Sequence, residues 1–297
     1  MTDTVSVRVL VPGDEPLLTP FFAAHPDTTL FLESNLLAGG LEDRGKALQG
    51  TYAAAVDATG AVVSVASHTW SGNLLLEAPL SLAAVARAAV AATGRPVAGL
   101  LGPADQVDAA RRALALESAP VSLDSREDLF RLSLERLLVP AALAAGEVRC
   151  RTPTDAELGP LTDWRHDYRV EEIRERPGER LREKARAELE LYQRLDRHFV
   201  LERGGQLVAY AAYNAATADC VQLGGVYTPP ALRSRGYGRG VVAGALLRAR
   251  ERGVRRSVLF TPIENAPAKK AYRTLGYERV GDYALLLFAD PVRPVGL

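Results

Sequence analysis

Hydrophobic residues recur along this chain with the spacings typical of strands and of helices. Short alternating or continuous apolar runs bounded by turn residues predict strands, whereas apolar residues three and four apart predict helices. In the first half, these patterns predict strands at 5–11, 51–57, 61–70, 97–101 and 128–137. They predict helices at 80–92 and 104–116, after one or two short helices before residue 37 that Pro16, Pro20 and Pro26 interrupt.

The second half repeats this order of elements. Strands are expected at 148–151, 198–202, 206–214, 256–260 and 280–288, and helices across 155–195 and at 241–252. Each half closes with a strand followed by a proline, at Pro140 and at Pro291. We therefore expect an α/β protein made of two related domains, 1–143 and 147–297, with their boundary in a stretch rich in Pro, Ala and Gly.

Length and composition are consistent with two domains and argue against several classes of protein. With 297 residues and 47% hydrophobic composition, the chain can fill two cores. The 36 Lys and Arg residues balance the 36 Asp and Glu residues, so net charge attracts neither nucleic acid nor an anionic membrane. The first residues lack the basic and apolar regions of a signal peptide, and no apolar run reaches about 18 residues. We expect a cytoplasmic protein with no nucleic-acid or membrane partner.

The cysteines and histidines indicate a reducing compartment and no metal site. Cys150 and Cys220 are too few for a disulfide scaffold and suit a reducing compartment. The four histidines are dispersed and complete no spacing typical of metal ligands, so no metal is expected.

The stretch 226–240, with sequence VYTPPALRSRGYGRG, carries the chemical signal in this chain. It predicts the end of a strand, a proline-marked turn, a glycine-rich loop and the first turn of a helix. Glycines let a ligand approach the backbone closely, and the free amides of a helix N-terminus carry partial positive charge. Arg233, Arg235 and Arg239 add full charges, so we expect this loop to bind a diphosphate.

Two phosphate-binding fingerprints overlap in this loop. Residues 238–243 fit the dinucleotide pattern G-x-G-x-x-A, and residues 233–238 fit R-x-x-G-x-G. A dinucleotide fold needs an acidic residue after the next strand, but that strand ends in Phe260-Thr261-Pro262. Residues 265–277 instead read N-x-x-A-x-x-x-Y-x-x-x-G-Y. The two motifs in this order resemble the GCN5-related N-acetyltransferase (GNAT) superfamily, at fold level over about residues 148–290.

The resemblance implies a fold, a cosubstrate and a set of site residues. The fold is the acyl-CoA N-acyltransferase fold, whose mixed, mostly antiparallel sheet is flanked by helices, and the cosubstrate is acetyl-CoA. Backbone groups of Val226, Tyr227 and Thr228 would hold the pantetheine and the acetyl oxygen, with Gly224 and Gly225 suited to a bulge that opens the strands. The residues that would bind the diphosphate are Arg233, Ser234, Arg235, Gly236, Tyr237, Gly238, Arg239 and Gly240.

The resemblance also assigns roles to two side chains after the loop. Asn265 would bind the pantetheine arm, although an Asn at this point is also a favoured helix N-cap. Tyr272 would protonate the departing thiolate, because a phenol keeps its proton at neutral pH; it could equally be a core aromatic.

The general base is the point at which the sequence departs from the family pattern. Several family members carry a glutamate on the first splayed strand, where this chain has Gln222, and an amide cannot take up a proton. Gln222 could orient the substrate or point into solvent. Glu171 and Glu172, in the early helical region, are the candidate bases, with surface ion pairs as the alternative. His198 is a weaker candidate base, and a structural role is the favoured alternative for it.

The predicted reaction is direct attack of a primary amine on acetyl-CoA in a ternary complex. The acceptor is expected to be a small molecule or an amino acid, and a homodimer stays open. The first half resembles a degenerate second copy, as in the tandem arrangement of mycothiol synthase, because residues 73–79 offer neither glycines nor arginines before their helix. Two other functions stay open: an acyl-CoA-binding regulatory module without turnover, and a nicotinamide-dependent oxidoreductase.

Overall fold

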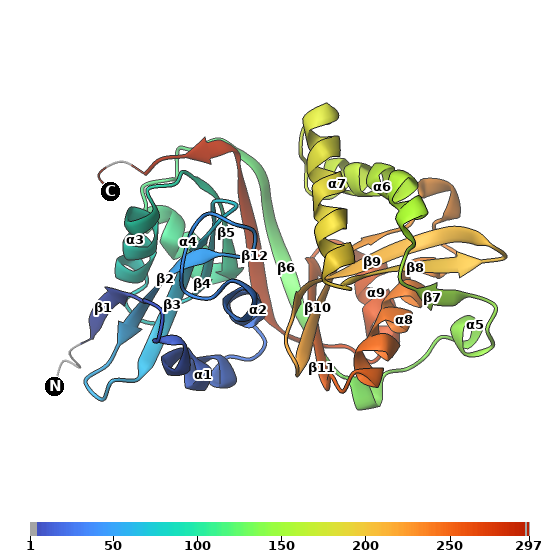
Figure 1. Ribbon diagram of the computed structural model, residues 1–297, viewed down its shortest axis with the longest axis horizontal. Helices are drawn as coiled ribbons and strands as arrows, with labels where there is room; N and C mark the ends of the chain where they lie inside the picture. Colours follow the sequence, from blue (N-terminus) through green and yellow to red (C-terminus); the bar gives the residue numbers. More distant parts are fainter. Residues whose placement is uncertain (1–4, 295, 297) are drawn as a thin grey trace. The chain divides into compact units, whose positions relative to one another are not determined.

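The computed structural model describes residues 5–294 and 296, and the chain divides into two compact units. Unit 1 is Met1–Asp128 together with Gly281–Leu297, and unit 2 is Leu129–Val280. Figure 1 follows the chain through both units in the colours of the sequence.

Most elements of the first half lie close to those predicted, but its last strand, expected at 128–137, spans Val121–Ser133. Its strands are β1 (Ser6–Val9), β2 (Gly50–Val56), β3 (Val62–Thr69), β4 (Asn73–Glu77), β5 (Val97–Pro103) and β6 (Val121–Ser133). Its helices are α1 (Glu15–Ala24), α2 (Leu30–Gly39), α3 (Leu82–Thr93) and α4 (Ala104–Ala113).

The second half contains the matching set. Its strands are β7 (Arg149–Arg151), β8 (His198–Arg203), β9 (Gln206–Ala216), β10 (Cys220–Tyr227), β11 (Arg256–Pro262) and β12 (Glu278–Val292). Its helices are α5 (Ala141–Ala144), α6 (Leu158–Glu171), α7 (Glu179–Arg194), α8 (Tyr237–Glu251) and α9 (Ala266–Thr274). Three short 3-10 turns are η1 (Leu134–Arg136), η2 (Asp155–Glu157) and η3 (Pro230–Leu232).

The two halves share one order of elements. Apart from α5 and the 3-10 turns, the described residues run strand, helix, helix, three strands, helix, strand, helix, strand, and then run through that order again. The predicted repeat of a mixed α/β fold is therefore confirmed.

One strand escaped prediction. Residues 73–77, which the sequence analysis treated as the approach to a helix, form β4, antiparallel to β3 and parallel to β5. Four of its five residues are buried, so its side chains are covered on both faces. A short run buried on both faces shows no alternation, and its hydrophobic pattern does not separate it from a helix approach.

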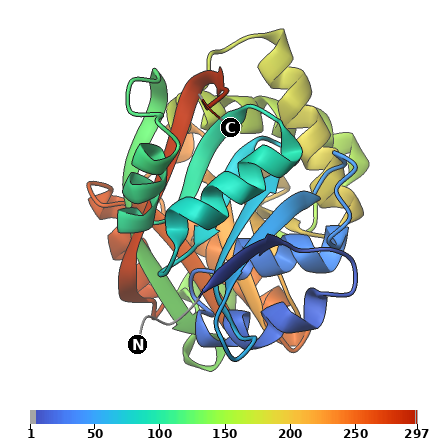
Figure 2. The same ribbon diagram turned by 90° about the vertical axis from the view of Figure 1, so that its left-hand side faces the viewer.

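Unit 1 has helices on both faces of its sheet. Its strands pair in the order β1-β2-β3-β4-β5, and β5 pairs next with β12. Helices α3 and α4 pack on one face through Val85, Ala89 and Val107, and Figure 2 shows α3 lying across the strands. Helices α1 and α2 pack on the other face through Phe21 and Leu32.

Unit 2 is layered in the same way. Its strands pair in the order β7-β8-β9-β10-β11-β6, and β10 pairs with β11 in parallel. Successive residues of β8 point to opposite faces: Phe199 and Leu201 pack with α8, and Val200 packs with α6 and α7. These two layers hold the strand and helix that carry the predicted site.

The compact units differ from the predicted ranges 1–143 and 147–297 because of the last strand of each half. Residues of β12 pair with β5, as Leu285 does with Leu101, and Leu286 and Phe288 lie in the core of unit 1. Phe130 of β6 lies in the core of unit 2. A strand's own sequence does not specify which neighbour it pairs with, so the periodicity could not reveal this.

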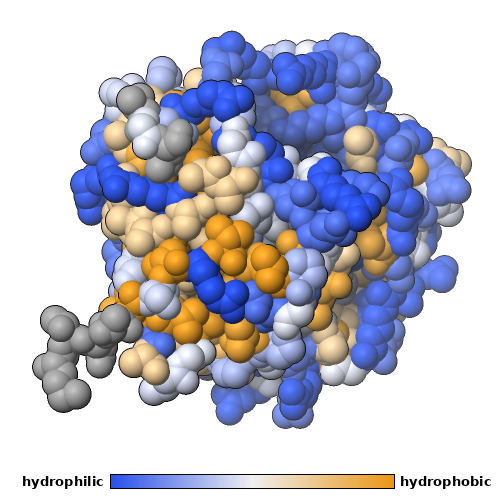
Figure 3. All heavy atoms as spheres, turned by 60° about the vertical axis from the view of Figure 1, so that its left-hand side comes forward, coloured by the Kyte–Doolittle hydropathy of each residue, from blue (hydrophilic) through white to orange (hydrophobic). Residues whose placement is uncertain are grey.

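The helices and the surface were compared with what a membrane-spanning or apolar surface would require. None of the helices described is long and apolar enough to cross a membrane. Figure 3 shows hydrophobic residues exposed among hydrophilic ones on the face it presents. The most exposed large hydrophobic residues of unit 1 are Val11, Leu37 and Leu80.

We predict that Leu286→Ala destabilises unit 1, although residue 286 lies near the C-terminus. Leu286 is 2% exposed, and a Leu→Ala change in a core costs about 2–5 kcal/mol of unfolding free energy. Urea unfolding measures the loss of unfolding free energy. Relative to the wild type, hydrogen exchange in the variant should become faster in α3 of unit 1 and stay unchanged in α8 of unit 2.

The matched control is Leu80→Ala, at a position that is 53% exposed, which should change stability by less than about 0.5 kcal/mol. Faster exchange confined to α8 in the Leu286 variant would contradict the assignment of β12 to unit 1.

Candidate active site

Strand β10 is paired differently on its two sides. Its parallel pairing with β11 runs from Cys220 to Gln222, opposite Arg256 to Val258, although both strands continue beyond these residues. On the other side, the antiparallel register with β9 shifts after Gln222 and again after Gly224. Gly225 has a φ of 59°, which a glycine adopts without strain. The predicted bulge at Gly224 and Gly225 is confirmed.

The predicted loop leads into the N-terminus of α8. Gly236 is the N-cap, with a φ of 79°, and it has no side chain that could cap the helix. The first intrahelical bond runs from the amide of Gly240 to the carbonyl of Gly236. The amides of Tyr237, Gly238 and Arg239 precede this bond and have no acceptor within the helix. This end of α8 can therefore donate to an anion.

The glycines of α8 serve two purposes. A Cβ added at Gly238 would meet Thr228 Oγ1 at 3.5 Å, which is ordinary contact, so this glycine leaves open space beside β10. A Cβ at Gly240 would lie 3.0 Å from Leu201, and one at Gly244 would lie 2.2 Å from Cys150 Cβ. Gly240, which was predicted to bind the diphosphate, is buried and allows α8 to pack on β8.

The predicted cationic side chains are exposed around the loop. Arg233 donates to the carbonyl of Thr228 at 3.0 Å and to Glu171 Oε2 at 2.5 Å. Arg235 donates to the carbonyl of Ala231 at 3.3 Å. Arg239 is exposed on the first turn of α8, and Ser234 has a φ of 62°. The loop thus presents three guanidinium groups near the free amides of α8.

The two candidate bases differ in their surroundings. Glu171, at the end of α6, is 36% exposed and forms the ion pair with Arg233. Glu172 follows it and is exposed. The structure therefore joins α6 to the glycine-rich loop through Glu171, and the hydrogen bond from Arg233 raises the pKa of that guanidinium.

Asn265 and Tyr272 lie on the second motif. The Oδ1 of Asn265 accepts a hydrogen bond from the amide of Ala268 at 3.1 Å, so this side chain caps α9. Tyr272 is half-buried beside the core of unit 2, with its ring centroid 6.4 Å from that of Phe130 and 6.0 Å from that of Tyr277. Both alternative roles from the sequence, cap and core aromatic, are thus present in the structure.

Gln222 does not point into solvent. It is 2% exposed on β10, and within the described residues its Oε1 has no hydrogen-bond partner. Val221 and Leu223 pack toward α8, so strand alternation places Gln222 on the opposite face, toward α6 and α7. Gly224 shares that face: a Cβ there would lie 2.0 Å from Asn214 Nδ2.

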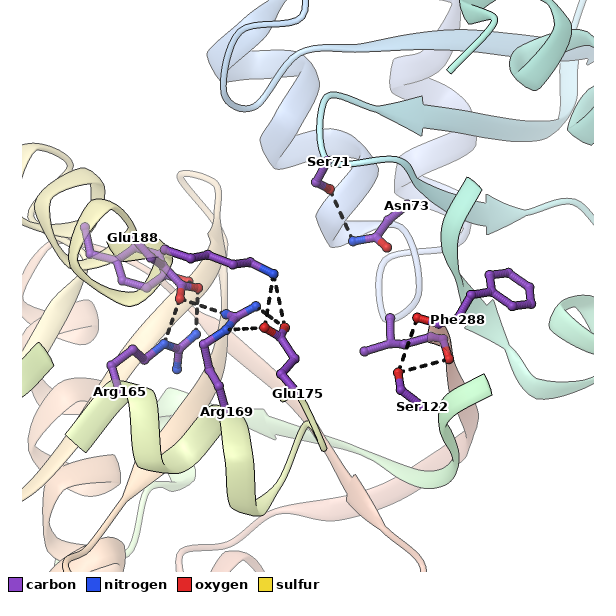
Figure 4. Close-up of polar contacts among 11 residues, drawn as sticks. Ser71, Asn73, Ser122, Arg165, Arg169, Glu175, Glu188 and Phe288 are labelled. Atoms are coloured by element: carbon purple, nitrogen blue, oxygen red, sulfur yellow. Dashed lines mark hydrogen bonds and ion pairs between the residues drawn. The ribbon is translucent and has the colours of Figure 1, made fainter. Parts of the chain in front are cut away.

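The same face carries an ionic cluster that the sequence analysis missed, in which Arg165 is buried and its neighbours are partly exposed. Arg165 of α6 binds Glu188 of α7 through two hydrogen bonds, of 2.8 and 2.6 Å. Glu188 also accepts from Arg169 at 2.9 Å, and Arg169 and Lys184 both bind Glu175. Figure 4 shows these side chains converging between the two helices. Pairs that lie 19 and 23 residues apart on two helices leave no local sequence pattern.

Burial and charge act in opposite directions within this cluster. Burial would raise the pKa of the Glu188 carboxyl, but the charge of Arg165 and its hydrogen bonds hold that pKa at about 2. The Tyr192 hydroxyl lies 3.2 Å from Glu188 Oε1 and 3.1 Å from Asn214 Oδ1, which links the cluster to β9. Burial raises the pKa of the Tyr192 phenol. Glu188 therefore stays ionised at neutral pH.

His198, the weaker candidate base, is buried and held by two neighbouring side chains. Its Nε2 lies 2.5 Å from Gln193 Oε1, and its Nδ1 lies 3.3 Å from the Tyr210 hydroxyl. Burial lowers the pKa of His198 to about 4, so the ring is neutral at pH 7.

Unit 1 differs at the equivalent strand end. The amide of Ala78, which directly follows β4, donates to Gln106 Oε1 at 2.6 Å. By the shared order of elements, Ala78 corresponds to Thr228 of unit 2. In unit 1, the Gln106 side chain therefore accepts a hydrogen bond from the backbone amide at this strand end. In unit 2, the corresponding residue, Thr228, lies at the start of the glycine-rich loop.

A surface hollow elsewhere in unit 2 is separate from this site. It lies between α6 and α7 and is lined by Gly159, Thr162 and charged residues of α7 such as Arg182 and Glu190. Its lining includes no residue of β10 or of the glycine-rich loop.

Comparison with known families decides between the readings of the loop. Residues 161–277, which contain β10, the glycine-rich loop and both motifs, match the model of the acetyltransferase (GNAT) family. Residues 161–277 therefore form a GNAT domain. No curated protein matches its sequence.

Solved structures with this fold cover nearly the whole chain. A Drosophila protein has 13% identity and a TM-score of 0.64 over 95% of this chain and 98% of its own. A GCN5-related N-acetyltransferase from Sphaerobacter thermophilus has 15% identity and a TM-score of 0.56 over 98% and 96%. A tandem GNAT protein from the clavulanic acid biosynthesis pathway has 15% identity and a TM-score of 0.54 over 97% and 99%. At these identities the likeness shows the fold alone, and that fold is the tandem GNAT arrangement.

We predict that Glu188→Gln in this GNAT domain costs about 3–5 kcal/mol of unfolding free energy. The change leaves the buried charge of Arg165 without its ionised partner, and breaking a buried pair by removing one member has this cost. Because the pKa of Glu188 is lowered, its contribution is present above about pH 4.5 and is lost as the pH falls toward 2. Denaturant unfolding at pH 7 and at pH 3 measures both effects.

The matched control is Glu190→Gln on the same helix. Glu190 pairs with Arg186, and both side chains are more than 40% exposed, so the change should cost less than about 1 kcal/mol. Equal costs at the two positions would show that the cluster adds no more stability than a surface pair.

Proposed function

We propose that this protein transfers an acetyl group from acetyl-CoA to a primary amine of a small molecule or amino acid. GNAT membership supports acyl transfer in general. The observation that carries the specific proposal is the N-terminus of α8, whose free amides follow a glycine N-cap. Arg233 and Arg235 precede this N-cap, and Arg239 lies in the first turn of the helix.

The first motif provides the parts that a CoA ligand needs. The diphosphate would accept from the amides of Tyr237, Gly238 and Arg239, with Arg233 and Arg235 nearby. The pantetheine would extend along β10 beyond Gln222, where the recorded pairing with β11 has ended, and bind the backbone of Val226, Tyr227 and Thr228. Asn265 would bind the arm through its amide nitrogen, since its Oδ1 caps α9.

The reaction proceeds by direct attack. The neutral amine nitrogen bonds to the thioester carbonyl carbon, the oxyanion forms beside the bulge of β10, and the carbon–sulfur bond then breaks. Tyr272 gives its proton to the departing thiolate, and the amine loses a proton to a base. The products are an N-acetylated amine and free CoA.

The base is assigned to the end of α6. Glu171 and Glu172 are carboxylates beside the loop, whereas Gln222 cannot accept a proton and would instead orient the amine through Oε1. Phosphate binding by Arg233 would compete with Glu171 for that guanidinium, so cosubstrate binding would free the Glu171 carboxylate. This coupling makes Glu171 the preferred candidate of the two.

We predict that Gly238→Asp abolishes acetyl-CoA binding without unfolding the protein. A Cβ fits at this position, and a carboxylate in the first turn of a helix is favourable for folding. The same carboxylate would repel the diphosphate. Isothermal titration of acetyl-CoA, CoA and NADH into wild type and variant, with thermal unfolding in parallel, gives both readouts.

The control is Gly159→Asp, at the second residue of α6 as Gly238 is at the second residue of α8, and a Cβ there meets nothing within 4 Å. This variant should bind acetyl-CoA like the wild type. Binding of NADH alone, or acetyl-CoA binding that survives in Gly238→Asp, would refute the proposed site.

We predict that Tyr272→Phe lowers kcat by about 10²–10⁴-fold, the range typical of a lost general acid, and leaves the Kd of acetyl-CoA unchanged. Phenylalanine keeps the ring beside Phe130 and Tyr277 and removes only the proton donor. Release of free thiol over an amine panel measures the rate. A kcat within threefold of wild type would assign Tyr272 to the core alone.

A further inference from the structure

We propose that Arg165 binds a carboxylate of the acceptor, which makes the preferred substrate an amine that also carries a carboxylate. This inference rests on the proposed function and narrows its substrate class. Its basis is a buried guanidinium nitrogen that faces β10 and has no partner among the described residues.

The orientation of Arg165 carries the first step. Its side chain is 6% exposed, and its Nε and Nη2 are both used by Glu188. The remaining nitrogen, Nη1, lies 2.2 Å from the position that a Cβ on Gly225 would occupy. Nη1 is therefore directed at the bulge of β10, the segment where the acetyl group would lie.

The charge of the cluster supports an anion at this point. Arg165, Arg169 and Lys184 bring three positive charges, and Glu175 and Glu188 bring two negative ones. One positive charge thus remains, and a single carboxylate would balance it, whereas a phosphate dianion would exceed it.

Gln222 supplies the complementary group. Its Oε1 is a buried acceptor without a partner among the described residues, on the face of β10 that points toward α6 and α7. An amine N–H donates to such an acceptor, and a carboxylate accepts from Nη1. A substrate with both groups would satisfy two buried atoms that otherwise cost free energy.

The experiment compares acids with their uncharged counterparts. N-acetyl amino acids and the corresponding N-acetyl amino amides are titrated into the CoA-saturated protein, and the parent amino acids and amides are tested as acceptors by thiol release. The acids should bind and react about 10- to 100-fold better than the amides, as expected for a charge-assisted hydrogen bond in a buried site.

The test variant is Arg165→Met with Glu188→Met. Replacing both members of a buried pair with apolar residues is often tolerated, and Arg169 and Tyr192 keep Glu175 and Asn214 as partners. The preference for acids should fall to about onefold while the Kd of acetyl-CoA is unchanged. The control is Asp163→Met with Arg182→Met, an exposed pair on the same two helices, which should keep the preference.

Each outcome decides between the two proposals. If acetyl-CoA binds and acids are not preferred over amides, or if their preference survives in the Arg165 and Glu188 variant, this inference is overturned and the acetyltransferase proposal stands. If acetyl-CoA does not bind, the proposed function falls first, and this inference falls with it.

Discussion

The early end of pairing between β10 and β11 is the constraint on which the site depends. The two parallel strands pair from Cys220 to Gln222, opposite Arg256 to Val258, and both strands continue beyond this register. Peptide groups of a strand need partners, and a bulged strand at the edge of such an opening is suited to bind an extended ligand. Gly224 and Gly225 allow the bulge, and the space above them is filled by Asn214 and Arg165. The opening thus connects the loop, the strand and the ionic cluster.

The helices on the two faces of the unit 2 sheet contribute different parts of the proposed site. Helix α8 presents free amides and arginines at the end of β10, and its later glycines allow close packing on Leu201 and Cys150. Helices α6 and α7 hold Arg165 against the same strand through Glu188. A donor site for the cosubstrate and a recognition site for the acceptor can therefore lie on opposite faces of one strand. Unit 1 keeps the fold, but Gln106 already binds the amide that ends its equivalent strand.

Local patterns were enough to predict the fold class, the repeat and the loop. The bulge, the start of α8 and the Asn265 cap follow from glycine, arginine and asparagine at fixed spacings, which act within a few residues. Contacts between distant segments were not predictable in this way. No pattern within either segment predicts the pairing of β12 with β5 or the ion pair of Arg165 with Glu188. Strand β4 lacks alternation because both its faces are buried. The burial of Gln222 depends in the same way on the packing around β10.

The most direct test of the account is hydrogen–deuterium exchange of the wild-type protein with and without acetyl-CoA. The account predicts slower exchange at the end of β10, over residues 226–228, and at the first turn of α8, over residues 237–240. The equivalent segment of unit 1, residues 78–82, should be unchanged. Protection confined to unit 1, or no protection at β10 and α8 under saturating acetyl-CoA, would contradict the claim that the second copy holds the cosubstrate.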